Sequence, residues 1–280
     1  MNERLDVQKT YKLFIGGAFP RSESGRTFAV HAPDGSLIAN VASASRKDLR
    51  DAVVAARSAQ TGWAARTAYN RGQILYRVAE VMEGRRTQFV EELCRCGVKA
   101  ATAELEVDRA IDRWVWYAGW CDKFHHIAGT VNSVAGPYFN FTTPEPTGVV
   151  GILAPEKPGL LGLVSRLAPA LVSGNTAVVL TGEASPLTAV SMAEVVATSD
   201  VPGGVVNILT GATHELLPWL LGHRDVNAVD LTGAPDLEAS VVAEAADNVK
   251  RLIRGEPDDQ SPYVIADFCE MKTVWHPIGR

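Results

Sequence analysis

The chain has 280 residues, a formal net charge of -5 and a hydrophobic content of 46%, enough for one large or two smaller domains. Its acidic balance argues against nucleic acid or an anionic membrane as partner, because both select a basic surface. No apolar run approaches a membrane span, the polar start resembles no signal peptide, and the four cysteines show no paired spacing. We therefore expect a cytoplasmic protein with reduced thiols.

The first part of the chain changes from strand-like to helical periodicity. Residues 12–20 place β-prone residues around two glycines and predict a hairpin, and strands are expected at 27–30 and 37–41 on either side of a Pro-Asp-Gly turn. Apolar residues then recur at helical spacing in four stretches: 45–60, 70–83, 87–96 and 100–124. The last of these carries three tryptophans, which we interpret as packing anchors rather than a ligand site.

The central block, from Gly148 to Gly211, alternates strand and helix. Its three strands, expected at 149–153, 176–180 and 205–209, are continuously apolar, as in parallel strands covered by helices on both faces. Helices are expected at 160–172 and 186–197. The alternation continues with helices at 214–222 and 235–246 and strands at 226–231 and 248–253.

These elements predict an α/β fold with a doubly wound parallel sheet of five strands, preceded by N-terminal helices. The stretch 130–143 alternates around Gly136-Pro137 and predicts a β-hairpin that protrudes from the sheet domain. Sheets of this kind bind ligands beyond the carboxyl ends of their strands.

Several motifs are similar to those of the NAD(P)-dependent aldehyde dehydrogenase superfamily. They are FIGGAF near the start, the strand and turn from Gly148 to Pro155, LAPALVSGNTAVVL at 167–180, VPGGVVNILTG at 201–211, and the strand ending Leu231-Thr232-Gly233. The resemblance runs from the first motif to about Asp267. It implies a Rossmann-like cofactor domain, a catalytic domain and an oligomerisation hairpin.

The resemblance also implies a division of this chain. Residues 1–129 and 144–267 correspond to the cofactor-binding domain, and 130–143 plus 271–280 to the oligomerisation strands. The segment after Asp267 passes directly into MKTVWHPIGR, which is similar to the family's terminal strand. We therefore expect a truncated member without most of the catalytic domain.

The family's chemistry needs a nucleophilic cysteine, an oxyanion-stabilising asparagine and a glutamate general base. The cysteine has no aligned counterpart, and Cys269 is interpreted as an incidental thiol. Lys157 stands at the asparagine position of the family's Pro-Trp-Asn-Phe-Pro turn, where an exposed loop lysine is the favoured interpretation. Glu256 is the candidate for a vestigial general base, although Asp258 and Asp259 replace the glycines that follow it in the family.

The resemblance also supplies a candidate set for NAD or NADP binding. The set is Pro155, Thr181, Glu183, Gly211, Thr232 and Gly233. Thr181 replaces a lysine that binds ribose in the family, and Glu238 replaces a glycine of the phosphate-binding helix. A carboxylate there competes with the pyrophosphate for the helix N-terminus, and Asp236 adds to the objection. We expect cofactor binding to be weak or lost.

No metal site is expected. His125 and His126 are adjacent on a helix, so their side chains diverge, and Cys94-Arg95-Cys96 offers no third ligand.

Three functions remain open. The first is a catalytically impaired aldehyde dehydrogenase-like protein with a structural or regulatory role, joined to a full-length aldehyde dehydrogenase or another oligomer partner. The second is an active NAD(P)-dependent oxidoreductase acting on aldehydes, possibly with a partner subunit. The third is a binding module for another small ligand in the same crevice.

Overall fold

The computed structural model describes residues 8–237 and 239–279. Its centre is a five-stranded sheet in the order β7-β6-β5-β8-β9, and every pair is parallel. The strands are β5 (Val149–Leu153), β6 (Thr176–Thr181), β7 (Val206–Thr210), β8 (Ala228–Asp230) and β9 (Arg251–Ile253). The predicted doubly wound parallel sheet is confirmed.

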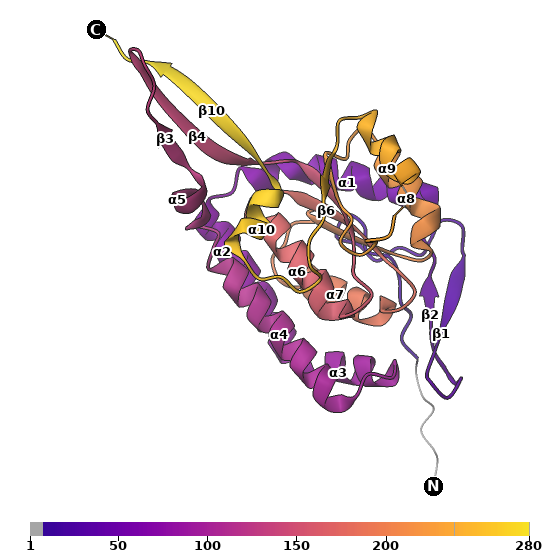
Figure 1. The fold of residues 1–280 in the computed structure, drawn as a ribbon. Helices are drawn as coiled ribbons and strands as arrows, with labels where there is room; N and C mark the ends of the chain where they lie inside the picture. The colour runs from indigo at the N-terminus through magenta and orange to yellow at the C-terminus, as the bar shows by residue number, and fades with distance from the viewer. Residues whose placement is uncertain (1–7, 238, 280) are drawn as a thin grey trace.

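Helices cover both faces of this sheet (Figure 1). Successive residues of β5 contribute to different cores, because neighbouring side chains of a strand point to opposite faces. Val150 and Ile152 belong to one hydrophobic cluster, whereas Val149 and Leu153 belong to a second cluster on the other face of the sheet. The connecting helices are α6 (Gly159–Val172), α7 (Pro186–Ala197), α8 (Thr213–Gly222) and α9 (Ala239–Ala246).

The N-terminal segment forms a short hairpin within residues 12–20, as predicted. Gly16 and Gly17 make its turn with positive φ. The flanking residues Ile15 and Ala18 exchange two backbone hydrogen bonds, each of 3.0 Å. Phe14 exchanges two backbone hydrogen bonds with Ile208 of β7, at 2.9 and 2.8 Å. The hairpin is therefore also attached to β7, at the edge of the central sheet.

The next elements follow the predicted order. An antiparallel pair, β1 (Thr27–His31) and β2 (Leu37–Ala42), precedes α1 (Arg46–Ala64). Ser45 and Asp48 form a reciprocal capping box at the start of α1. The helices that follow are α2 (Ala68–Gly84), α3 (Arg86–Arg95), α4 (Ala100–Ala118) and α5 (Phe124–Ala128). The single helix predicted at 100–124 is wrong at its end, because α4 stops before Gly119.

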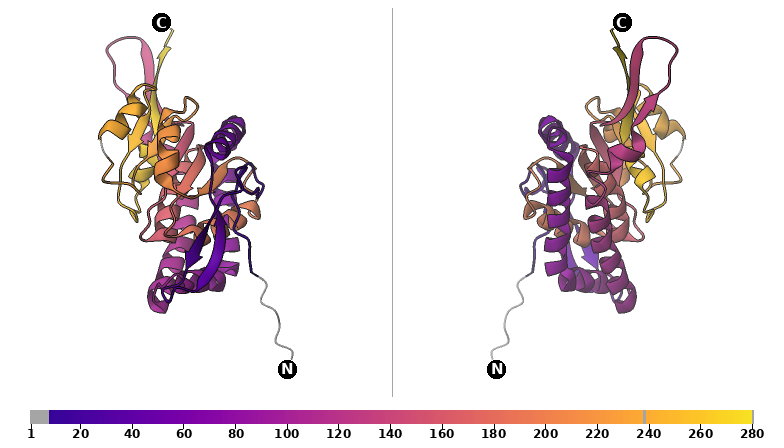
Figure 2. Two further views of the ribbon diagram at one scale, coloured as in Figure 1. Left: turned by 90° about the vertical axis from the view of Figure 1, so that its right-hand side faces the viewer. Right: turned by 90° about the vertical axis from the view of Figure 1, so that its left-hand side faces the viewer.

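A three-stranded antiparallel sheet projects from the body (Figures 1 and 2). It consists of β3 (Thr130–Asn132), β4 (Tyr138–Pro146) and β10 (Cys269–Pro277), with β4 in the middle. A short helix, α10 (Pro262–Asp267), leads into β10. The hairpin predicted at 130–143 is confirmed, and the terminal segment of the sequence supplies its third strand. Within residues 8–237 and 239–279, no helix is both long enough and apolar enough to span a bilayer.

Candidate functional site

A cavity of about 390 Å³ lies at the carboxyl ends of the parallel strands. Its walls come from the turns after β5, β6, β7 and β8 and from the first turns of α8. The lining residues are Leu153, Ala154, Glu156, Gly182, Glu183, Gly211, Ala212, Thr213, His214, Leu217, Gly233, Ala234 and Leu237. This is the place where a doubly wound sheet binds its ligand.

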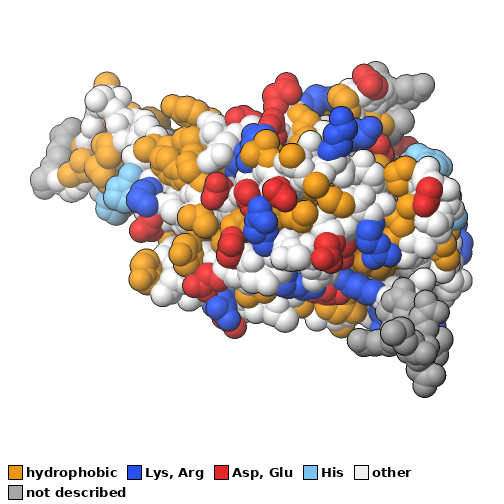
Figure 3. Space-filling view, turned by 90° about the horizontal axis from the view of Figure 1, so that it is seen from below, with side chains coloured by type: hydrophobic (Ala, Val, Ile, Leu, Met, Phe, Trp, Pro, Cys, Tyr) orange, Lys and Arg blue, Asp and Glu red, His pale blue; other side chains and the backbone are white. Residues whose placement is uncertain are grey.

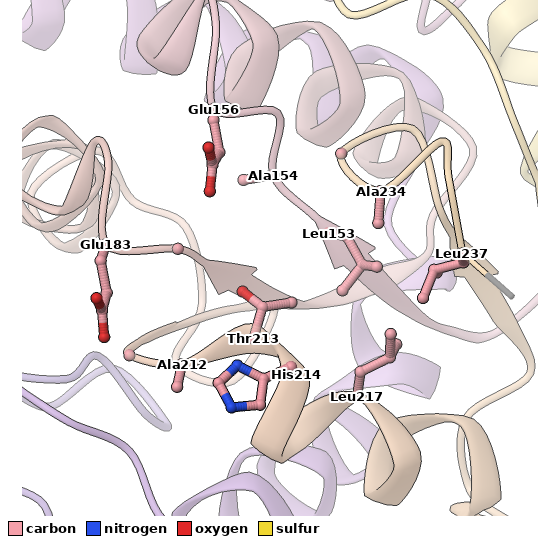
Figure 4. Close-up of a pocket in the computed structure, with 13 residues that line it drawn as sticks. Leu153, Ala154, Glu156, Glu183, Ala212, Thr213, His214, Leu217, Ala234 and Leu237 are labelled. Carbon is pink, nitrogen blue, oxygen red and sulfur yellow. The ribbon is translucent and has the colours of Figure 1, made fainter. Parts of the chain in front are cut away.

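The cavity has an apolar end and a polar end (Figure 4). Leu153, Leu217 and Leu237 lie together with Ala234 at one end, and they could pack against a flat ring. Glu156 and Glu183 lie at the other end, with Thr213 and His214 between the two. Both carboxylates are exposed, and neither forms an ion pair within the described part of the chain. Among the described residues, no lysine or arginine contributes to the walls.

The two ends of the cavity therefore differ in how well they fit NAD(P). The apolar end fits a base ring, but the polar end carries two carboxylates, those of Glu156 and Glu183. Arg254, a basic residue near this region, donates to the Pro235 carbonyl oxygen at 3.0 Å and does not line the cavity. The charges of the described lining do not fit a dinucleotide, because they include two carboxylates and no basic partner for its phosphates.

Gly233 and Thr232 have structural roles in this turn. A Cβ on Gly233 would lie 2.5 Å from the Leu153 carbonyl oxygen, so only glycine permits the approach of this turn to the end of β5. Thr232 is buried and donates its backbone N–H (2.9 Å) and its hydroxyl (2.5 Å) to Asp230 Oδ1. The Thr232 hydroxyl also accepts from the Gly255 backbone N–H at 3.1 Å. These three hydrogen bonds of Thr232 are all made within the fold.

The other predicted cofactor residues divide between the cavity and the core. Glu183, Gly211 and Gly233 line the cavity, whereas Pro155, Thr181 and Thr232 do not. Pro155 is buried against α6, where a Cβ on Gly162 would lie 2.8 Å from it. Thr181 is buried at the end of β6. Asp236 is exposed in the turn before α9, and Glu238 lies outside the described residues.

The structure does not bring the candidate catalytic residues Cys269, Lys157 and Glu256 into contact through any hydrogen bond or ion pair of the described residues. Cys269 is buried, and burial raises the pKa of its thiol to about 11, which disfavours the nucleophilic thiolate. Lys157 and Glu256 are exposed.

The loop after Glu256 is held by two arginines that sequence reasoning missed. Arg109 pairs with Asp258 at 2.9 Å. Arg113, buried in α4, donates to the carbonyl oxygens of Asp258 and Asp259 at 2.9 and 2.8 Å. The two aspartates that replace glycines therefore belong to a structural clamp on this loop.

No metal centre is formed by the described residues, since no three His, Cys, Asp or Glu side chains converge there. His125 and His126 lie in α5, and burial is the main cause that lowers the pKa of His125. Cys94 and Cys96 are half-buried free thiols.

The fold and the cavity define an α/β protein with a Rossmann-like ligand crevice. The model for the aldehyde dehydrogenase family matches residues 19–277, so the chain belongs to the aldehyde dehydrogenase family. The mouse (Mus musculus) cytosolic 10-formyltetrahydrofolate dehydrogenase is 34% identical over 96% of this chain. DhaS of Bacillus subtilis is 32% identical over 97% of it. The chain spans only 30% and 56% of the lengths of these two relatives.

Solved structures agree with this assignment. An NAD+ complex of an aldehyde dehydrogenase from Bacillus cereus superimposes with a TM-score of 0.81 at 28% identity. The comparison covers 87% of this chain and 50% of that one. HpcC from Thermus thermophilus gives a TM-score of 0.81 at 31% identity, over 87% of this chain and 47% of its own.

Proposed function

We propose that this chain is a catalytically impaired aldehyde dehydrogenase-like subunit with a structural or regulatory role. It joins a full-length member of the family, and the sheet of β3, β4 and β10 forms the contact. In this proposal residues 1–129 and 144–267 are the scaffold, 130–143 and 271–280 are the oligomerisation strands, and the partner supplies the catalytic residues. A cytoplasmic location is part of the proposal, which the four free cysteines support.

The observation that carries the proposal is the exposure of large apolar side chains on this sheet. Val131, Phe141 and Val274 stand directly opposite one another on adjacent strands and therefore share one face. Val131 is 71% exposed and Val274 is 40% exposed. The opposite face also carries exposed apolar groups, including Trp275 at 58%. Hydrophobic side chains gather over this projecting arm, at the left of Figure 3, and such patches mark interaction surfaces.

The chemistry of the crevice supports catalytic impairment. Lys157 stands at the oxyanion position as an exposed, flexible cation rather than a placed amide. Glu156 replaces the tryptophan of the family's turn and brings a carboxylate to the cavity. Together they weaken both transition-state stabilisation and dinucleotide binding.

Co-expression of this chain with a full-length aldehyde dehydrogenase of the same organism tests the proposal. Copurification in a fixed ratio is the expected result. Two matched substitutions test the contact. Val131→Asp places a charge on the arm, and Val54→Asp, the control, makes the same change at a valine of α1 that is 58% exposed. Val131→Asp should abolish copurification and Val54→Asp should not. If the native chain and both variants all fail to associate with the full-length protein, the proposal fails.

The second candidate is an active NAD(P)-dependent oxidoreductase. The position of the cavity, beyond the carboxyl ends of the strands, favours it. This function requires dinucleotide affinity, so calorimetric titration with NAD and NADP decides between the two. Saturable binding with turnover of an aldehyde would support it, and no binding at millimolar cofactor would end it.

A further inference from the structure

A second cavity, of about 380 Å³, lies between the α3–α4 connection and the start of α7. Glu106 of α4 contributes to its wall, as do the turn that precedes α6 and the first residues of α7. This second cavity is separate from the ligand crevice of the central sheet and from the projecting arm, although Glu156 lines both cavities.

Glu106 is a fixed and buried carboxylate. Its relative exposure is 9%, and its Oε1 accepts the backbone N–H groups of Leu160 and Leu161 at 2.8 and 3.2 Å. These amides belong to the first turn of α6, where N–H groups have no partner within the helix. The positive end of a helix also attracts a carboxylate. The fold therefore supplies a preorganised anion at this point.

The second oxygen of this carboxylate has no protein donor among the described residues. Both recorded hydrogen bonds end on Oε1. Oε2 is not one of the buried polar atoms that are sealed from solvent without a partner, so it keeps some contact with solvent, and Glu106 lines the cavity. Because no donor among the described residues reaches Oε2, a ligand in the cavity that carries a donor group can hydrogen-bond to it.

The surroundings of Oε2 suit a cation with an apolar body. Thr102, Ser185 and Thr188 line the same cavity with hydroxyl groups. The hydroxyls of Ser185 and Thr188 donate to backbone carbonyl oxygens at 3.4 Å, so their oxygens remain free to accept. Leu93 and Leu187 supply apolar wall.

The charges of the lining disfavour an anionic ligand. Carboxylates stand at the wall (Glu106) and the rim (Glu156), against one lysine, Lys157, which is exposed. Within the described part of the chain, Lys157 forms no ion pair with either carboxylate. A neutral alcohol would offer Oε2 one uncharged donor, whereas a primary ammonium offers three charged ones.

We propose that this cavity binds a small primary ammonium ligand with an apolar body. The ammonium group donates to Glu106 Oε2 and to hydroxyls at Thr102 and Thr188, and the body packs on Leu93 and Leu187. The site is independent of the proposed subunit role, because it involves no residue of β3, β4 or β10.

Calorimetric titration with benzylamine and benzyl alcohol, two probes of similar shape, tests the charge requirement. At pH 7 the protonated amine should bind at least about 10-fold more tightly than the alcohol, as expected for a hydrogen bond to a charged group. Equal affinities, or no benzylamine binding at 10 mM, would overturn the proposal.

Variants then test the residues. Glu106→Gln should weaken benzylamine binding by about 10- to 100-fold, whereas Glu104→Gln makes the same change at an exposed position of α4 and should alter it less than about 2-fold. Because Glu106 also caps α6, Thr102→Val serves as a second variant that leaves the cap intact, and it should weaken binding by about 3- to 10-fold. Unchanged binding in a folded Glu106→Gln or in Thr102→Val would contradict the assignment. None of these outcomes bears on copurification with a family partner.

Discussion

Arg166 of α6 and Asp230 of β8 form a fully buried ion pair, with Nε 2.6 Å from Oδ2. The other oxygen of Asp230 holds Thr232, so one carboxylate links a helix, a strand and the turn that borders the ligand crevice. Arg166 Nη2 is buried and has no hydrogen-bond partner among the described residues. Asp230 is therefore the acidic group that compensates the buried guanidinium of Arg166.

Removing one member of this pair should be strongly destabilising. We expect Asp230→Ala to lower the free energy of unfolding by about 3–5 kcal/mol, because it leaves a buried guanidinium uncompensated. Urea denaturation measures the change. Asp51→Ala, which breaks the exposed Arg50–Asp51 pair, is the control and should cost no more than about 1 kcal/mol. If both variants lost a similar free energy of unfolding, burial would not be the reason why the Arg166–Asp230 pair matters for stability.

Gly233→Ala tests whether this glycine serves the fold. The new Cβ would meet the carbonyl oxygens of Leu153 and Ala154 at 2.5 and 2.6 Å, so we expect a loss of about 1–3 kcal/mol. Gly62→Ala is a matched change inside α1 with no atom within 4 Å, and it should stabilise by about 0.5–1 kcal/mol. Thermal unfolding compares the two, and a neutral Gly233→Ala would refute the packing role.

The pH dependence of stability reports on the buried thiol of Cys269. Burial raises its pKa from the ordinary value of 9.0 to about 11, so the folded state retains a proton that the unfolded state loses. The contribution of the buried Cys269 thiol to the free energy of unfolding is therefore complete below about pH 9, and it disappears as pH rises through about 11. Cys269→Ser should flatten the decline of unfolding free energy across this window by up to about 1.4 kcal/mol per pH unit. Denaturation series at pH 8, 9, 10 and 11 give the slopes, and identical slopes would contradict the assignment.

Glu156 and Glu183 should limit dinucleotide binding by charge alone. Each carboxylate about 4 Å from a phosphate would cost about 1 kcal/mol at the dielectric constant of water, or about 5-fold in affinity. The double variant Glu156→Gln/Glu183→Gln should therefore bind NAD more tightly than the native chain, most clearly at low salt. Glu83→Gln, at an exposed position of α2, provides the control. Weaker or unchanged binding in the double variant would show that the carboxylates are not the obstacle.

The sequence predicted those elements whose signals are local. The bounds of β5 and α7 are as expected, because a continuous apolar run and a proline at the first helical turn mark them. The hairpin at 12–20 forms through the pairing of Ile15 with Ala18, but the additional pairing of Phe14 with Ile208 was not predicted, because Ile208 is distant in the chain. The short helix α10 was not predicted, although Ser261 and Pro262 are a recognisable start signal.

The site was predictable only in part. Glu183, Gly211 and Gly233 follow strands and were placed in the candidate set from family motifs. Leu217 and Leu237 were missed, because an apolar residue on a helix or turn shows no sign of facing a cavity until the elements are packed. The structural role of Thr232 was also hidden, since it depends on Asp230 and Gly255.

The most direct test of the subunit proposal is the mass of the assembly. Native mass spectrometry of this chain, co-expressed with a full-length aldehyde dehydrogenase of the same organism, should show a defined complex that contains both chains. With Val131→Asp/Val274→Asp, which places charge on the exposed face of the arm, that complex should disappear while each chain stays folded. Separate masses for the two native chains, or a complex unaffected by the double variant, would contradict the account.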